Sequence, residues 1–527
     1  MTAATSARHA IADPRGQRIL VLAALLLAFF VNLGGYALFD LDEGAFSEAT
    51  REMVANGQYG STTVDGEPRY DKPILTYWAQ AVFVHLLGPD ELAFRLPSAL
   101  AALAWGLALW GFVRERDDTE GATSAAMVVA FGLGSGVIGR VATADGLLNL
   151  WLALAFMDMV RWYEAPRRPV LWRTWLWLAL GFLTKGPVAV GIPAVASLLF
   201  FSSSGRWRDW LRAIGTPVGW LIFLAVNVPW YVVVYLEQGA GFFRAFFLEH
   251  NLGRFTGTME SHGGSLGYYF VVLPIVLLPF TGWFLATLPR LRRFRDLPDD
   301  ERFGWTWFAL VFVLVSLSAT QLPHYILYGL TPLALVMARH RDALRSRILA
   351  FLPPLLLAAG LLALPSLAAY GYAHIDAPDV HALLARGPAA FGTGYYVAVG
   401  AAVTAGLAVA FLPWPPVRRL LAIGAIQSLC LVAVVTPALA NLQQTPVREA
   451  ALLARESSGP VIAWGIDKPS FSVYRRASTP HRAPRPGDTV FTRAHRVDDL
   501  EARFPGRALD TLYRAGGIAL IRVPADS

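Results

Sequence analysis

Residues 19–39 read ILVLAALLLAFFVNLGGYALF, and the acidic stretch DLDEG at 40–44 follows at once. An apolar run of about 20 residues is long enough to cross a bilayer as a helix. It lacks the small-residue cleavage site of a signal peptide, so we interpret it as a retained span. The carboxylates behind it lie at a membrane boundary, where an ionised side chain is costly unless it is paired or used.

The composition of the whole chain indicates a membrane protein with many spans. Of its 527 residues, 55% are hydrophobic and 16% are charged, which is too apolar for an ordinary soluble domain. The net charge of +7 does not indicate nucleic-acid binding, because the arginines lie in short clusters between apolar runs. The single cysteine, Cys430, lies in an apolar run and excludes an internal disulfide.

Hydropathy along the chain predicts an all-α polytopic protein with about 13 transmembrane helices. No internal repeat is visible among these runs. The candidate spans lie near 19–39, 92–113, 122–138, 146–162, 170–184, 187–202, 213–236, 266–288, 304–319, 323–338, 348–369, 392–412 and 418–440.

The arginine clusters predict the orientation of these spans. With a cytoplasmic N-terminus, six clusters fall on inner connections, as the positive-inside rule requires. They are Arg114/Arg116, Arg161/Arg167/Arg168/Arg173, Arg206/Arg208/Arg212, Arg290/Arg292/Arg293/Arg295, Arg339/Arg341/Arg345/Arg347 and Arg418/Arg419. The rarer polar residues then gather on the extracytoplasmic face, in short turns such as TADG (143–146) and TKGP (184–187). This concentration on one face indicates a site.

Two further features lie outside the spans. The first outer loop predicts two amphipathic helices suited to the membrane surface, one over 43–56 that Gly57 ends, and one with Pro73 in its first turn. We predict a transmembrane domain over 1–440 and a small extracytoplasmic α/β domain over 441–527. In the latter, VIAWG (461–465), DTVFTR (488–493) and GIALIRV (517–523) predict strands, and VDDLEARF (497–504) predicts a helix. This domain could gate a cavity or bind an acceptor, or only pack as a cap.

The carboxylates after the first span can be interpreted in two ways. Asp40 could cap the helix that follows, with Glu43 three residues later completing a capping box. That role leaves Asp42 without a structural purpose, so we interpret Asp42 as functional.

Six motifs, in this order, resemble the GT-C glycosyltransferase superfamily, and in particular the lipid A aminoarabinose transferases and their protein mannosyltransferase-like relatives. The motifs are DLDEGAFSEATREM (40–53), RYDKPILTYWAQ (69–80), FRLPSALAAL (94–103), TADGLLNLW (143–151), FLTKGPVAV (182–190) and LPHYILYGLTPLAL (322–335). The resemblance implies a helical membrane domain in which a polyprenyl-phosphate sugar donates its sugar to an acceptor on the outer face, usually with inversion. The acceptor could be lipid A, another glycan or lipid, or a protein.

This reaction needs a carboxylate that accepts the proton of the acceptor hydroxyl, and a cation or helix N-terminus that stabilises the leaving phosphate. Asp42 is the candidate base and Lys72, ahead of Pro73, the candidate phosphate ligand. The resemblance maps the family's first-loop acidic motif onto Asp42 and Glu43, and its acidic-Lys-Pro motif onto Asp71, Lys72 and Pro73.

The resemblance also adds Asp145 to the catalytic group, and Lys185, Arg254 and Tyr325 to the donor phosphate site. Each of these four residues could instead have a structural role, and without the resemblance Arg254 would be interpreted as an ordinary loop residue. Asp145 could cap a helix, Lys185 could extend toward the interface, and Tyr325 with His324 could belong to an interfacial aromatic belt.

A divalent metal could bind to Asp71 with His250 or His262, but no closely spaced ligand pair requires one, so no cofactor is predicted as essential. Ala45 stands where aminoarabinose transferases carry an arginine, which leaves the sugar and the acceptor open. The expected location is a bacterial inner membrane, with the site facing the periplasm. The alternative function is a secondary transporter or a flippase for lipids or lipid-linked sugars, although transporters place their sites near the midplane and tend to show repeated halves.

Overall fold

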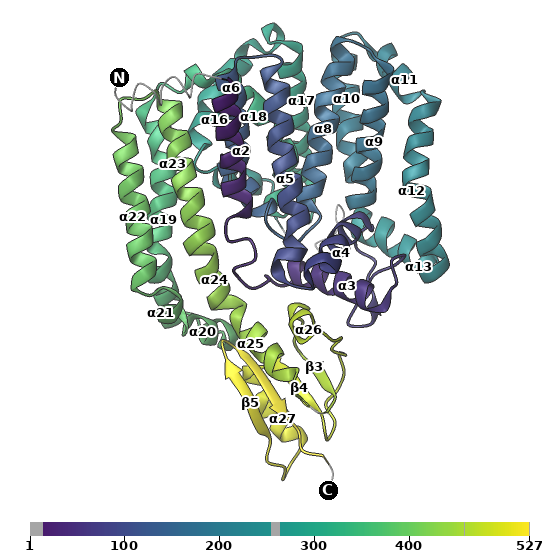
Figure 1. Cartoon of the computed structure of the whole chain (residues 1–527), viewed down its shortest axis with the longest axis vertical. Helices are drawn as coiled ribbons and strands as arrows, with labels where there is room; N and C mark the ends of the chain where they lie inside the picture. The colour runs from purple at the N-terminus through teal and green to yellow at the C-terminus, as the bar shows by residue number, and fades with distance from the viewer. Residues whose placement is uncertain (1–13, 254–263, 458, 526–527) are drawn as a thin grey trace.

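The computed structural model describes residues 14–253, 264–457 and 459–525, without the side chains of residues 250–252. A bundle of helices fills most of the molecule, and a small four-stranded sheet lies at one end of it (Figure 1). The longer helices of the first half are α2 (Pro14–Phe30), α5 (Glu91–Arg114), α6 (Thr119–Phe131), α8 (Asp145–Glu164), α9 (Arg168–Lys185), α10 (Val188–Ser203) and α12 (Pro217–Gln238). Those of the second half are α17 (Asp299–Leu317), α18 (Leu330–Arg339), α19 (Arg347–His374), α22 (Thr393–Ala410) and α23 (Pro416–Cys430).

Within the described ranges, five helices are long and apolar enough to cross a membrane: α5, α12, α19, α22 and the continuous run Pro416–Gln443, which contains α23 and α24 (Thr436–Gln443). A pair of helices, Tyr268–Val276 (α15) and Thr281–Asp296, could form a sixth span, although the chain bends by 114° at the break between them. The other predicted spans are mostly present as shorter or more polar helices. The fold is therefore helical and membrane-type, as predicted, while the count of 13 spans stays a prediction.

Large aromatic side chains form the centre of the bundle. Trp105, Trp283 and Trp307 are fully buried, with Phe156 among them. Two indole groups satisfy their N–H inside this apolar region: Trp105 Nε1 donates to Thr331 Oγ1 at 2.8 Å, and Trp307 Nε1 donates to the Tyr328 carbonyl at 2.9 Å. Such pairing lets a large amphipathic ring be buried without an unsatisfied donor.

The C-terminal region contains the strands and the helix predicted for it. The sheet order is β3-β4-β6-β5, with β3 (Val461–Trp464) parallel to β4 (Thr489–Arg493) and β6 (Ile518–Arg522) antiparallel to both β4 and β5 (Asp510–Ala515). Side chains that alternate along the strands pack on opposite faces, as the two-residue period of a strand requires. Helix α27 (Val497–Arg503) covers one face, and α25 (Thr445–Ala454) with α26 (Ser470–Arg475) covers the other.

Helix α3 (Asp42–Asn56) is the amphipathic helix predicted for the first loop, and it ends at Gly57, whose φ of 68° suits glycine. Its apolar side, with Phe46, Ala49 and Met53, packs against α4 (Leu75–Leu87) and α12. Its polar side is not open to solvent, as it would be in a helix that lies on the membrane surface, because α26 packs over it and every residue from Glu43 to Met53 is buried. Figure 1 shows α3 and α4 between the bundle and the sheet.

Candidate active site

The predicted site residues of the described chain lie where helices begin or end, at the end of the bundle that carries α3. Asp42 is the first residue of α3, Asp145 is the first residue of α8, and Lys185 is the last residue of α9. Lys72 stands shortly before α4, which begins at Leu75, so Pro73 precedes the helix and is not in its first turn. Tyr325 lies in a 3-10 helix over Pro323–Gly329.

Asp40 does not have the role that its place in the sequence suggested. The residue before α3 is Leu41, and no side chain caps this helix. The Asp40 carboxylate instead accepts hydrogen bonds from the backbone N–H and the hydroxyl of Ser470, at 3.0 Å and 2.5 Å, and so ties the first loop to α26. Burial raises the pKa of Asp40 to about 6, although Lys468 and the bonds from Ser470 act in the opposite direction. The predicted capping box is therefore wrong, because a partner more than 400 residues away takes the carboxylate.

Glu43 is a buried partner of an arginine. Its two oxygens accept from Arg95 Nε and Nη2 at 2.9 Å and 2.8 Å, and each also accepts a backbone N–H, from Ala142 and from Phe39. Arg95 is itself fully buried and donates to three carbonyls of the 33–37 segment. A bidentate pair with every group satisfied fixes the geometry of the loop that carries Asp42.

Asp42 contrasts with both of its acidic neighbours, because its side chain is exposed. It is the first residue of α3. Its charge also acts on Arg69. A carboxylate that is open to the surroundings can meet an incoming hydroxyl and accept its proton.

Arg69 binds Asp71 and is influenced by the charge of Asp42, and it was not predicted as a site residue. Its guanidinium binds the Asp71 carboxylate at 2.7 Å and donates to the Tyr77 hydroxyl at 3.1 Å. Burial alone would lower the pKa of Arg69, but Asp71, then Tyr77 and Asp42, outweigh it and raise that pKa further. The only sequence signal was its place two residues before Asp71 in RYDKP.

Lys72 adds a second cation beside this arginine. Its Nζ lies 3.5 Å from Asp71 Oδ2, and its side chain is largely covered. Asp71 therefore faces two cations at once, and the group as a whole carries more positive than negative charge before Asp42 is counted. Such a cluster suits an anionic ligand such as a phosphate.

A second group forms around Asp145. Its Oδ1 accepts from Lys185 Nζ at 2.7 Å and from the Tyr328 hydroxyl at 2.9 Å, and Lys185 Nζ also donates to that hydroxyl at 3.0 Å. His324 Nε2 lies 3.5 Å from Asp145 Oδ2. No side chain caps α8, so a capping role for Asp145 does not hold, and Lys185 does not extend to an interface but pairs with this buried carboxylate.

Tyr325 completes the second group. The Lys185 ammonium lies 5.1 Å from the centre of its ring, within the range of a cation–π contact, and the ring stacks on Tyr328 at 5.8 Å. Tyr328 was missed at the sequence level, although it follows Tyr325 at a helical spacing of three in PHYILY.

The two groups flank one hydrophobic cluster. Ala144 and Leu183, which adjoin Asp145 and Lys185, are buried with Ile74 and Tyr77, which follow the Lys72 segment. Motifs that are spread over nearly 300 residues of sequence thus lie around the same hydrophobic cluster.

Three predicted residues cannot be compared with the geometry. Arg254 and His262 lie outside the described residues, as does the side chain of His250. Among the residues described, the acidic group whose ligand atoms come within 4.8 Å of one another is Glu48, Glu52 and Asp65. Its oxygens already accept from Arg51, Thr63, Ser472 and the backbone N–H of Thr479, so it forms a hydrogen-bonded contact with the C-terminal region.

Comparisons with known proteins agree with the motifs. A family model described as dolichyl-phosphate-mannose-protein mannosyltransferase matches residues 71–233. The undecaprenyl phosphate-alpha-4-amino-4-deoxy-L-arabinose arabinosyl transferase of Pseudomonas paraeruginosa is 30% identical over 331 residues, 60% of this chain and 58% of that protein. The enzyme of the same name from Serratia proteamaculans is 27% identical over 63% of this chain and 60% of its own length. The matched region thus spans less than two thirds of these relatives.

The fold is similar to a solved structure over nearly its whole length. The crystal structure of ArnT from Cupriavidus metallidurans bound to undecaprenyl phosphate aligns with a TM-score of 0.79 at 20% identity, covering 96% of this chain and 98% of that chain. The predicted resemblance to GT-C glycosyltransferases, and in particular to the aminoarabinose transferase, is therefore confirmed, and the fold is that of the ArnT structure.

Proposed function

We propose that this protein is a membrane glycosyltransferase that moves a sugar from a polyprenyl-phosphate donor to a lipid acceptor, at the end of the bundle that carries α3. The observation that carries the proposal is the exposed carboxylate of Asp42 at the start of α3, beside the Arg69–Asp71–Lys72 group. The relatives named after undecaprenyl phosphate and arabinosyl transfer support this donor class and a pentose as the sugar.

Asp42 is the proposed base. As the acceptor hydroxyl attacks the anomeric carbon of the donor sugar, its proton passes to the Asp42 carboxylate, and the bond between that carbon and the phosphate oxygen breaks. Attack opposite to the leaving phosphate inverts the configuration at the anomeric carbon. Arg69, whose pKa the charge of Asp42 helps to raise, supplies a positive charge to this end of the bundle.

Glu43 acts by positioning in this proposal. Its oxygens are all occupied by Arg95 and by two backbone N–H groups, so it holds the start of α3 in place and does not take part in proton transfer.

The donor phosphate is proposed to bind at Lys72, beside Arg69. Charge accumulates on this phosphate as the sugar leaves, so a cation in contact with it stabilises the transition state more than the ground state. Lys185 is a weaker phosphate ligand, because Asp145 and Tyr328 already take two of the three protons of its ammonium group. Asp145 is proposed to hold Lys185 and, through Tyr328, the ring of Tyr325 beside the donor. Arg254 is also proposed to bind this phosphate, and only the family resemblance supports that role.

Purified protein in proteoliposomes tests the proposal, with a radiolabelled sugar on undecaprenyl phosphate as the donor. Lipid A, a phospholipid and a Ser/Thr-rich peptide are offered as acceptors in separate vesicles. Transfer of label to lipid A or to the phospholipid is the expected result. Movement of the intact donor between leaflets without any transfer would instead establish the flippase alternative and overturn the proposal.

A further inference from the structure

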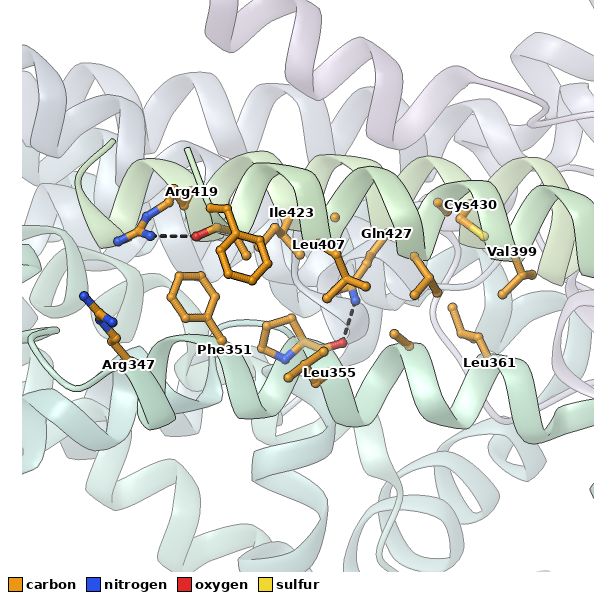
Figure 2. Close-up of a pocket in the computed structure, with 17 residues that line it drawn as sticks. Arg347, Phe351, Leu355, Leu361, Val399, Leu407, Arg419, Ile423, Gln427 and Cys430 are labelled. Carbon is orange, nitrogen blue, oxygen red and sulfur yellow. Dashed lines mark hydrogen bonds between the residues drawn. The ribbon is translucent and has the colours of Figure 1, made fainter. Parts of the chain in front are cut away.

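A long groove lies on the outside of the bundle, between α19, α22 and α23, and none of the proposed active-site residues lines it. Its volume is about 380 Å³. Leu355, Leu361, Val403 and Leu407 are among the mostly apolar side chains that line it, and Figure 2 shows the lining side chains facing one another across the groove. Gln427, the polar residue midway along it, donates its amide N–H to the Pro354 carbonyl at 2.7 Å.

One end of the groove carries two arginines. Arg347 is the first residue of α19, and Arg419 lies in the first turn of α23 (Figure 2). Arg419 donates to the Ala410 carbonyl at 2.7 Å and lies over the Phe351 ring at 5.1 Å. Its Nε is buried without a hydrogen-bond partner, and neither arginine has a carboxylate within 4.0 Å in the part of the chain that the structure describes.

Two neighbouring arginines differ. Arg418 pairs with Glu120 at 2.9 Å, and Arg341 pairs with Asp118. Two positive charges are thus left without acidic partners, among the described residues, at the mouth of an apolar groove. That arrangement is the complement of an amphiphile with an anionic head.

The length of the groove indicates which amphiphile fits. Along α19 its lining extends from Arg347 to Leu361. At 1.5 Å per residue this is about 21 Å, close to half of the roughly 40–45 Å bilayer thickness that includes the head groups. The groove therefore matches one leaflet. The helix that begins beside Arg419 continues through α24 into the C-terminal region, so the arginines lie at the end of the bundle opposite to the sheet and to α3 (Figure 1).

We propose that this groove binds one anionic phospholipid, with its phosphate between Arg347 and Arg419 and one acyl chain along α19, α22 and α23. A zwitterionic lipid fits less well, because its ammonium group would be placed near two arginines. The bound lipid comes from the leaflet opposite to the proposed donor site, so it is not the donor.

Native mass spectrometry of delipidated protein tests this, with dioleoyl phosphatidylglycerol and dioleoyl phosphatidylcholine added in turn. The variant R347Q/R419Q should bind phosphatidylglycerol about tenfold more weakly than the wild type, since each arginine near a lipid surface contributes to anion binding. The variant R345Q/R418Q removes the same charge from the same end of the bundle, at residues that do not line the groove, and should bind as the wild type does.

A third variant tests the apolar part. A Cβ on Gly406 would meet only Ile423, at 3.9 Å, so the leucine of Gly406→Leu has room to extend into the groove. It should reduce binding of both lipids while the protein elutes as folded in size-exclusion chromatography. Equal loss in the two double variants, equal affinity for the two lipids in the wild type, or preferential binding of undecaprenyl phosphate at this site would each overturn the proposal.

Discussion

Asp40 and Asp42 stand two positions apart in one loop, and their surroundings give them different chemistry. Ser470 takes both oxygens of Asp40, whereas Asp42 is exposed at the start of α3. The same substitution to asparagine removes the charge and keeps the shape at either position, so the pair separates catalysis from structure.

Asp42→Asn should abolish most of the sugar transfer. General-base catalysis contributes roughly a hundred- to ten-thousand-fold, so the rate should fall on that scale while donor binding and folding are kept. The measurement is initial rate in proteoliposomes at saturating donor. Asp40→Asn is the control and should retain activity in the folded fraction; an inactive but folded Asp40→Asn beside a normal Asp42→Asn would reverse the two roles.

Asp40 should instead affect the pH dependence of stability. Its pKa of about 6 in the fold is above its ordinary value of 3.8, so the folded state holds this proton more tightly than the unfolded state does. The stability that Asp40 contributes is therefore complete below about pH 4 and is lost as pH rises through 6. Relative to Asp40→Asn, the wild type should lose about 1 kcal/mol of unfolding free energy between pH 5 and pH 7. Thermal unfolding in detergent at the two pH values measures the difference in stability between the wild type and Asp40→Asn. A difference that grows in favour of the wild type at pH 7 would contradict the expected sign.

Lys72→Ala should weaken donor binding about tenfold or more, because a charge-assisted contact with the phosphate is lost. Lys72→Arg keeps the charge and should retain most of the affinity. Titration calorimetry with the sugar-bearing undecaprenyl phosphate donor gives both values. If Lys72→Ala bound this lipid as tightly as the wild type, the phosphate would have to be placed elsewhere.

Local sequence patterns identified single residues better than they identified partners. Asp42 was recognisable because a charge at a membrane boundary is unusual wherever it occurs, whereas the family resemblance identified Asp71 and Asp145. The pairing of Glu43 with Arg95 was not, because the two residues are 52 positions apart and a local capping box accounted for Glu43 equally well. Partnership across such distances depends on the packing of the whole bundle.

At the scale of elements, the C-terminal region is held to the bundle by a shared core. Phe471 and Leu520 belong to the same buried cluster as Leu38 and Phe94. Tyr474 adds a polar link, since its hydroxyl accepts from the Leu38 N–H at 2.7 Å and donates to Glu91 at 3.1 Å.

Tyr474→Phe should loosen this docking. The change leaves the buried Leu38 N–H without its acceptor, which costs about 1–3 kcal/mol, while the ring packing is kept. Faster hydrogen exchange over α26 and residues 36–39 is the expected result. Tyr513→Phe removes a hydroxyl bonded to Glu449 at an exposed site and serves as the control. Unchanged exchange in Tyr474→Phe would show that the apolar core alone holds the region.

Elements were predictable where burial leaves a periodic pattern. Helix α3 has apolar residues at helical spacing, and β3, β4 and β6 are short apolar runs that are buried on both sides. Strand β5 was missed because DTLYRA lies at the sheet edge and has no fully buried residue, so its sequence has no apolar alternation. The sequence pattern also did not predict that the polar side of α3 is covered, because the helix that covers it, α26, comes from the other end of the chain.

For the whole molecule, the structure brings the first loop and the sheet to one end and leaves the arginine clusters at the other. Ion pairs such as Arg116–Glu164 and Arg341–Asp118 lie at that second end, which the positive-inside rule assigns to the cytoplasm. The side of the membrane on which Asp42 lies stays a prediction, and it decides which leaflet supplies the donor.

Cysteine labelling in spheroplasts tests this orientation. Cys430, the chain's one cysteine, is buried and is first replaced by alanine. A cysteine at Glu67 in the first loop or at Ala502 in α27 should then react with an impermeant thiol reagent in intact cells, because both positions are exposed.

A cysteine at Ala165, exposed between α8 and α9 at the other end, should react only after lysis. Buried positions such as Ser472 would give no information, because the reagent could not reach them from either side. Labelling of Ala165→Cys in intact cells, with Glu67→Cys protected until lysis, would invert the topology and place the carboxylate of Asp42 in the cytoplasm. The donor sugar would then have to be presented in the inner leaflet, and the arginines at the phospholipid groove would face outward, against the positive-inside rule.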